Sequence, residues 1–539
     1  MPAPPSHLIA MLDEAIYYSR MALGIYRFLR TTPLPNPEAV IRHQLENRAP
    51  TFLNTARQVI FSNPRNPYHE MFRLAGCTFE DLAQGVTKDG LEATLAVLHR
   101  QGVYLTHDEF KGQAPIVRAG WHIPAQTRDF RNPLVTGLME SRSSGSRSKG
   151  TRTPRSTEDQ LYVEAHLQLL DRELGLSGRP HIEVKPILPS TTGLGSCLRA
   201  HRRGHRVERW FAVGGAWRDS GHYRWLTQGL VWFGNLLGAG APSPTYLPQN
   251  DFAPVAMWIA RRRAEGAACV VRSYTSSAVR VAAAALERGL DIHGTMFVVA
   301  GEALTEAKRA VIEKAGAELC TVYAITEVGT VGRACRQMKT GDCVHLLQDG
   351  LAVISRRRLA PLSDVEVDAL LFTNLLPFAA HVLINAEMGD SGVIEPARCD
   401  CLFSRMGFTQ QVRGIRSYGK LTGQGMTLVG TDIVRILEEV LPARLGGAAG
   451  DYQLVEHEGA TQTQLTLRVS PRVGIASPEK ARECFLTEIR RFHGGALAAR
   501  MWSHAEGVDV AIAEPLSTRT GKVLLLHLLG SGAEGPHAT

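Results

Sequence analysis

Residues 268–323 decide the fold, and they read ACVVRSYTSSAVRVAAAALERGLDIHGTMFVVAGEALTEAKRAVIEKAGAELCTVY. An apolar run at 268–271 precedes a helical pattern over 277–288, and a second apolar run covers 296–300. Apolar runs of this length, alternating with helical periods, indicate buried strands joined by helices. Such βα units build a mostly parallel sheet, so the stretch predicts an α/β protein.

The second helix of this stretch carries its own start and stop signals. Thr305 is a predicted N-cap, residues 306–315 keep a helical period, and Gly316 can take the left-handed conformation that ends a helix. The next strand is predicted at 318–323. Because ligands gather at the carboxyl ends of parallel strands, we expect the loops starting at Arg272, Gly301 and Ala324 to share one crevice.

Composition places the chain among globular proteins. Its 539 residues are 44% hydrophobic and 21% charged, which excludes a disordered or fibrous chain. The 60 basic residues against 52 acidic ones give a net charge of +8. The basic residues occur in short scattered clusters without interleaved aromatic platforms, a pattern that makes nucleic acid an unlikely partner. Nine cysteines are too sparse for a disulfide scaffold. No signal peptide or membrane span is evident, so we expect a cytoplasmic protein with no membrane partner.

The predicted secondary structure differs in two regions outside the βα stretch. Residues 1–130 read as mostly helical, and after residue 416 the pattern becomes a smaller α+β unit. We therefore expect a large domain over 1–415 with a mostly parallel sheet and helices, and a small α+β domain over 416–539. Residues 530–539 are glycine-rich and are expected to be disordered.

A polar loop interrupts the chain at residues 141–156. Hydroxyls, glycines and cations stand together there, and these groups suit a polyphosphate, because small residues let backbone N–H groups approach phosphate oxygens. A flexible Ser/Gly linker would have a similar composition. The candidate phosphate-binding residues are Ser143, Ser144, Gly145, Ser146, Lys149, Gly150 and Thr151.

Together with later motifs, this loop resembles the phosphate loop of the ANL superfamily of adenylate-forming enzymes, and most closely the phenylacetate-CoA ligase-like branch. Residues 323–327, YAITE, resemble the family's tyrosine-glycine-x-threonine-glutamate signature, and residues 517–522, STRTGK, resemble its C-terminal catalytic loop. The sequence departs from the family's motifs at three places. Arg147 and Ser148 differ in the phosphate loop, Ala324 replaces a glycine, and residues 418–419 replace the paired aspartates of the hinge.

The resemblance implies a role for each matched residue. Gly301, Glu302 and Ala303 would flank the adenine together with Tyr323 and Ala324, and Asp390 would bind the ribose. Arg416 would begin the interdomain hinge, which would make the small C-terminal domain mobile. Thr326 would contact phosphate, Glu327 would ligate Mg²⁺, and Lys522 would be the catalytic lysine. A lysine ammonium can stabilise charge that builds between an attacking carboxylate and the α-phosphate.

Cysteine and histidine also gather in two short clusters on either side of Asp390. The candidates are Cys335, Cys343, His345, Cys399 and Cys401. Zinc takes four such ligands in a tetrahedron, and paired short spacings from two loops can supply them. Comparable sets occur in the phenylacetate-CoA ligase-like branch. We predict a structural zinc held by four of the five.

The resemblance implies a reaction with two steps. ATP and a carboxylic acid would form an acyl-AMP with release of pyrophosphate, and the acyl group would then pass to an acceptor. Coenzyme A is the first candidate acceptor; an amine, a hydrazine, a protein acceptor or activation of nitrite are alternatives. Tyr274 and Ile325 suit an apolar or aryl acid, and Trp217, Trp232 and His222 are further lining candidates. The non-enzymatic alternatives are a degenerate fold acting as a binding protein and a zinc-dependent nucleic-acid factor.

Overall fold

A computed structural model of the chain describes residues 6–136, 139–142, 152–213, 221–248, 251–338, 342–360, 366–418, 422–423, 426–427, 430–458, 463–475, 477–491, 508–518 and 521–529. The predicted strands lie inside a twelve-stranded sheet of order β13-β14-β15-β16-β12-β11-β10-β9-β8-β5-β6-β7. One half is parallel and comprises β5 (His181–Val184), β6 (Val207–Ala212), β7 (Pro244–Tyr246), β8 (Val270–Tyr274), β9 (Met296–Ala300) and β10 (Glu318–Ile325).

The other half of the sheet corrects the prediction of a mostly parallel sheet. It is antiparallel and comprises β11 (Gly329–Arg333), β12 (Val344–Leu346), β13 (Leu351–Leu359), β14 (Glu366–Asn374), β15 (Ala386–Pro396) and β16 (Gln410–Ser417). The only helix among the described residues that link β10 to β16 is the five-residue α14 (Leu402–Met406), which is too short for the crossover that parallel pairing requires. The protein is therefore α/β with a mixed large sheet.

The helices of the βα stretch follow their sequence signals. They are α12 (Thr275–Glu287) and α13 (Glu306–Lys314). The Thr305 side chain accepts a hydrogen bond from the Lys308 backbone N–H, which confirms the N-cap, and Gly316 has φ +78° beyond the last turn. With α11 (Ala253–Ala264) they pack against the parallel strands around a core that includes Val271, Phe297 and Val299.

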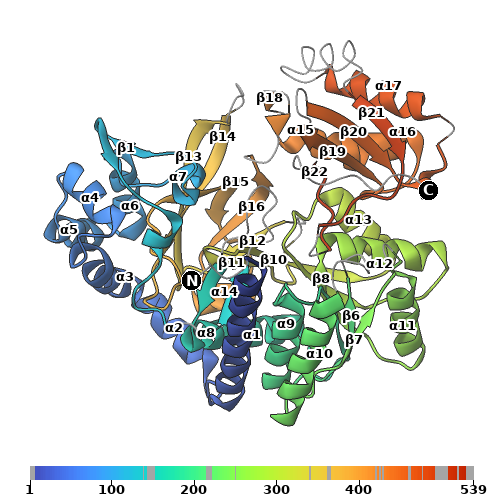
Figure 1. Cartoon of the computed structure of the whole chain (residues 1–539), viewed down its shortest axis with the longest axis horizontal. Helices are drawn as coiled ribbons and strands as arrows, with labels where there is room; N and C mark the ends of the chain where they lie inside the picture. The colour runs from blue at the N-terminus through green and yellow to red at the C-terminus, as the bar shows by residue number, and fades with distance from the viewer. Residues whose placement is uncertain are drawn as a thin grey trace.

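The helical N-terminal region is confirmed. It contains α1 (Ser6–Arg30), α2 (Pro37–Glu46), α3 (Arg48–Ala56), η1 (Arg57–Phe61), α4 (Pro67–Leu74), α5 (Phe79–Asp89), α6 (Leu91–Arg100) and α7 (His107–Lys111). Figure 1 shows α3 to α7 beside β13 and β14, whereas α1 runs beside α9 (Thr192–Arg202) and α10 (Gly221–Leu236). The connection to the parallel strands holds the pair β3 (Met139–Arg142) and β4 (Arg152–Arg155), then α8 (Thr157–Leu174).

The C-terminal part forms a smaller sheet of order β21-β20-β19-β22. Its strands are β19 (Tyr452–Glu458), β20 (Thr463–Val469), β21 (Val508–Ile512) and β22 (Leu526–Leu529), and its helices are α15 (Gly430–Arg435), η3 (Ile436–Val440), α16 (Leu441–Leu445) and α17 (Pro478–Ile489). It has a core of its own that includes Tyr452 and Phe485. In Figure 1 this unit lies above α12 and α13. The domain division at residue 416 stays a prediction.

No helix among the described residues is long and apolar enough to cross a membrane.

Candidate functional site

The carboxyl ends of β8 and β9, two of the three strands predicted to end at one crevice, lie side by side. Thr275 Oγ1 donates a hydrogen bond to the Glu302 carbonyl at 3.1 Å. The Glu302 carboxylate accepts from Ser276 N–H at 2.6 Å and from Ser276 Oγ at 2.9 Å. Burial raises the pKa of Glu302, although nearby Lys308 and Lys522 oppose that rise. The Glu302 carboxylate therefore caps the first turn of α12, where backbone N–H groups lack hydrogen-bond partners inside the helix.

The prediction for Arg272 needs a correction. Arg272 lies inside β8 and its Nη2 donates to Asp171 at 2.7 Å, so it is a buried structural residue; β8 continues to Tyr274, and α12 begins at the next residue, Thr275. Ala324 likewise lies within β10, where its side chain is exposed. Neighbouring side chains of a strand point to opposite faces of the sheet, and the apolar pattern of the sequence does not show on which face a cationic side chain will lie.

Lys522 reaches the crevice from the C-terminal unit. Its Nζ donates to the Gly301 carbonyl at 3.1 Å and lies 5.1 Å from the centroid of the Tyr274 ring. Gly301 has φ +83°, and a Cβ there would meet Lys522 Nζ at 3.1 Å. The lysine loop is closed by the hydrogen bond from Thr518 N–H to the Lys522 carbonyl, at 2.7 Å. The structure thus brings Lys522, Gly301 and Glu302 together.

Tyr323 and Asp390 also come together. The Tyr323 hydroxyl donates to Asp390 Oδ2 at 2.8 Å across 67 residues of sequence. Burial, followed by the Asp390 charge, raises the pKa of Tyr323 well above its usual value, so the phenol keeps its proton. Arg416 lies on the neighbouring strand opposite Ser391, and its Nη1 donates to Asp342 Oδ2 at 2.6 Å. In this arrangement Arg416 is paired with a carboxylate.

Glu327 lies in a cluster that the sequence did not predict. Its Oε1 is 2.5 Å from the Lys111 ammonium at the end of α7. Burial would raise the pKa of Glu327, but Lys111 outweighs it and holds the pKa below its usual range. His381 Nδ1 donates to the Glu327 carbonyl at 3.0 Å, and Arg155 Nη2 donates to the Thr326 carbonyl at 3.5 Å. No local motif marks these partners, because Lys111 lies 216 residues away in sequence.

The predicted phosphate loop lies outside the described residues. This applies to Ser143, Ser144, Gly145, Ser146, Lys149, Gly150 and Thr151. Its flanks are described: β3 and β4 pair with Arg142 opposite Arg152. Because Arg155 at the end of β4 contacts Thr326, the base of this hairpin lies against the 323–327 segment.

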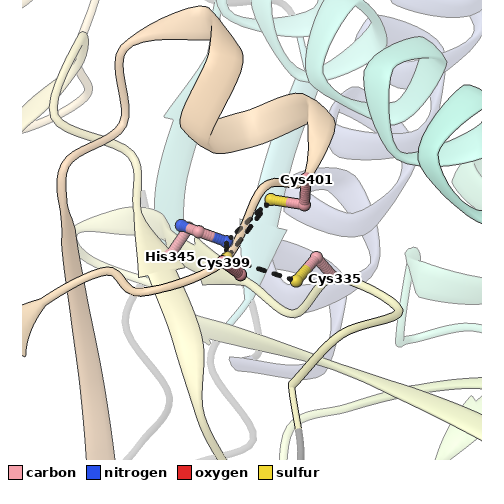
Figure 2. A group of neighbouring side chains, drawn as sticks. All are labelled: Cys335, His345, Cys399 and Cys401. Carbon is pink, nitrogen blue, oxygen red and sulfur yellow. Dashed lines mark hydrogen bonds between the residues drawn. The ribbon is translucent and has the colours of Figure 1, made fainter.

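Four of the five zinc candidates form a cluster, shown in Figure 2: Cys335, His345, Cys399 and Cys401. Their possible ligand atoms all lie within 4.8 Å of one another. Cys401 Sγ is 3.1 Å from His345 Nε2, and Cys399 Sγ is 3.6 Å from Cys401 Sγ and 3.9 Å from Cys335 Sγ. Ligands at roughly 2.0–2.3 Å from a tetrahedral zinc lie about 3.3–3.8 Å apart, so one of these distances falls within that range and the other two lie within about 0.2 Å of it. Cys343 is buried but is not in the group.

The cluster fastens two connections of the large sheet. Cys335 follows β11 and His345 lies in β12, whereas Cys399 and Cys401 lie between β15 and α14 (Leu402–Met406). The hydrogen bond from Cys335, together with His345, holds the pKa of Cys401 well below its usual range, so one thiolate ligand is favoured. The cluster lies just beyond the ends of β11, which pairs with the strand of Tyr323, and of β15, which carries Asp390.

Comparison with solved structures finds distant similarity. A structure of 2-hydroxyisobutyryl-CoA ligase in the postadenylation state with R3-HIB-AMP has a TM-score of 0.47 and 16% identity, over 94% of this chain and 91% of that chain. An open conformation of the same ligase with 2-HIB-AMP and CoA has a TM-score of 0.42 and 16% identity, over 95% and 92%. ATP-bound MatB from Rhodopseudomonas palustris has a TM-score of 0.38 and 13% identity, over 71% and 66%.

Comparison by sequence finds no matching family model and no matching curated protein. The structural likeness to these ligases is distant, with TM-scores below 0.5.

Proposed function

We propose that the protein is an adenylate-forming ligase of the phenylacetate-CoA ligase-like branch, which activates a carboxylic acid as its acyl-AMP at the expense of ATP. The observation that carries the proposal is the position of Lys522. A lysine from the C-terminal unit lies 3.1 Å from the Gly301 carbonyl, in the crevice where ligands of a parallel sheet gather. The resemblance assigns adenine to this turn and the catalytic ammonium to this lysine.

The proposed first step is an in-line displacement at the α-phosphorus of ATP. An oxygen of the substrate carboxylate forms a bond to phosphorus, the bond to the bridging oxygen breaks, and pyrophosphate leaves with that electron pair. The Lys522 ammonium neutralises charge that develops between the carboxylate and the α-phosphate. Asp390 has two carboxylate oxygens that can accept from ribose hydroxyls, and Tyr323 orients one of them. Mg²⁺, when bound, would neutralise triphosphate charge near Glu327.

In the second step the acyl group passes to an acceptor, for which we propose coenzyme A. The thiolate sulfur would attack the acyl carbon and AMP would leave. An amine, a hydrazine or a protein acceptor would attack the same carbon, and nitrite would take the place of the acid in the first step. We also propose that zinc occupies the cluster of Cys335, His345, Cys399 and Cys401, because three thiolates and an imidazole at these distances suit that metal. Its role is structural.

The experiment is pyrophosphate–ATP exchange over a panel of aliphatic and aryl acids, run with and without coenzyme A. We expect Lys522→Ala to lower acid-dependent exchange by about 100-fold or more while ATP binding is retained, because the lysine acts on charge in the transition state. Lys480→Ala is the matched control, since Lys480 is an exposed lysine in the same C-terminal unit. Unchanged exchange in Lys522→Ala would refute the role of the lysine. No exchange with any acid would favour the non-enzymatic binding protein.

A further inference from the structure

Lys111 and Glu327 form an ion pair between the N-terminal helical region and the 323–327 segment. Lys111 Nζ and Glu327 Oε1 are 2.5 Å apart, and the two side chains are only 13% and 9% exposed. Lys111 is the last residue of α7, whose start is fixed by a capping box between Thr106 and Glu109. Lys111 is thus held at the end of an ordered helix, and its ion pair with Glu327 is largely buried, unlike an ion pair on the protein surface.

The surroundings hold both residues in place. Phe110, which is fully buried, packs edge-to-face against His381 with ring centroids 5.5 Å apart. His381 Nδ1 donates to the Glu327 carbonyl at 3.0 Å, and the Lys111 ammonium lies 5.6 Å from the centroid of the Phe110 ring. Helix α7 therefore fixes the side chain of Glu327 directly and its backbone through His381.

This pair bears on the metal that the resemblance assigns to Glu327. One carboxylate oxygen is already taken by an ammonium, and a divalent cation on the other oxygen would stand next to that positive charge. A glutamate that serves only Mg²⁺ has no need of a buried lysine at hydrogen-bond distance. The arrangement fits a site in which a protein side chain supplies part of the positive charge that faces the phosphates of ATP.

We propose that Lys111 is a nucleotide-binding residue whose ammonium, held by Glu327, supplies positive charge to the triphosphate of ATP and reduces the need for Mg²⁺. The inference rests on the proposed function, since it takes ATP as the ligand. Two consequences follow for binding. The protein retains substantial affinity for ATP without a divalent cation, and loss of the Lys111 charge makes that affinity strictly dependent on Mg²⁺, because the freed Glu327 can then ligate the metal alone.

The test measures ATP binding by calorimetry, in Mg²⁺ and in EDTA, with the full chain. For the wild type we expect the Kd to rise less than about tenfold in EDTA. Lys111→Met should weaken binding in EDTA by about tenfold or more and leave binding in Mg²⁺ within about threefold of the wild type; tenfold corresponds to about 1.4 kcal/mol. Lys111→Arg should keep the wild-type behaviour. The control is Lys88→Met, which changes an exposed lysine of α5.

Either of two outcomes for the wild type and Lys111→Met would overturn the inference. One is wild-type binding that is abolished by EDTA, which assigns the charge to the metal alone. The other is an equal loss in both media for Lys111→Met, which assigns Lys111 a purely structural role. If Lys111→Met does not fold, the double variant Lys111→Met/Glu327→Gln removes both charges together, and it should lose ATP binding in EDTA and in Mg²⁺ alike; retained binding in EDTA would overturn the inference. A wild type that binds no ATP in either medium refutes the proposed function itself.

Discussion

At the scale of single residues, the buried His381 makes the stability of the fold depend on pH. Its side chain is buried, Nδ1 donates to the Glu327 carbonyl, and burial lowers the pKa of the imidazole to about 4. Between about pH 4 and the usual value near 6.5, the unfolded chain binds a proton that the folded chain does not. His381 therefore makes its full contribution to stability above pH 6.5. As the pH falls toward 4, the free energy of unfolding decreases by about 3 kcal/mol in total because of this group.

The measurement is thermal unfolding at several values between pH 7.5 and 4.5. His381→Asn should flatten the fall in Tm across this window, because an asparagine does not titrate there. His43→Asn, at an exposed position of α2, should leave the fall unchanged. A curve for His381→Asn parallel to that of the wild type would contradict the buried, neutral histidine.

At the scale of elements, the cysteine and histidine cluster joins the β11–β12 connection to the β15–α14 connection. We expect about one zinc per chain by metal analysis, and loss of that zinc in Cys401→Ser, because zinc needs the full ligand set. Removing the metal should lower the Tm by about 5 °C or more, since four ligands that were held in one place are released.

The control for the metal experiment is Cys77→Ser, at a partly exposed cysteine outside the cluster. It should keep both the zinc and the Tm. Equal metal content in Cys401→Ser and the wild type would exclude the site, as would a Tm that does not respond to a strong chelator.

At the scale of the whole molecule, a buried ion pair fastens the C-terminal unit to the large sheet. Lys308 Nζ on α13 lies 2.8 Å from Glu438 Oε1 on η3, and the side chains are 7% and 0% exposed. The Thr305 hydroxyl also donates to Glu438. Lys308→Met leaves the carboxylate buried without a partner, so it should destabilise the fold by about 3–5 kcal/mol. Movement of the C-terminal unit about the hinge that the resemblance places at Arg416 would have to break this pair.

Chemical denaturation measures the effect, with the neighbouring residue as control. Arg309→Met breaks an exposed pair with Glu313 and should cost less than about 1 kcal/mol. The double variant Lys308→Met/Glu438→Leu should recover most of the loss, because neither charge remains buried. Similar midpoints for Lys308→Met and Arg309→Met would show that the pair does not hold the two units together.

The sequence by itself determined the elements whose signals are local. The βα alternation of 268–323, the Thr305 cap, the glycine stop at 316 and the helical N-terminal region all follow from residue period and capping chemistry, which act over a few residues. The short cysteine and histidine spacings were readable for the same reason, although they did not tell which four of the five candidates meet.

Only the tertiary structure decided the pairings between distant segments. The pairing of β12 with β16, the contact of Lys522 with Gly301 and the ion pair of Lys111 with Glu327 join residues far apart in sequence. Such contacts depend on how faces pack and which buried charges find partners, and no period or spacing along the chain records that. Arg272 illustrates the limit: the sequence placed it at a strand end, but packing turned it toward Asp171.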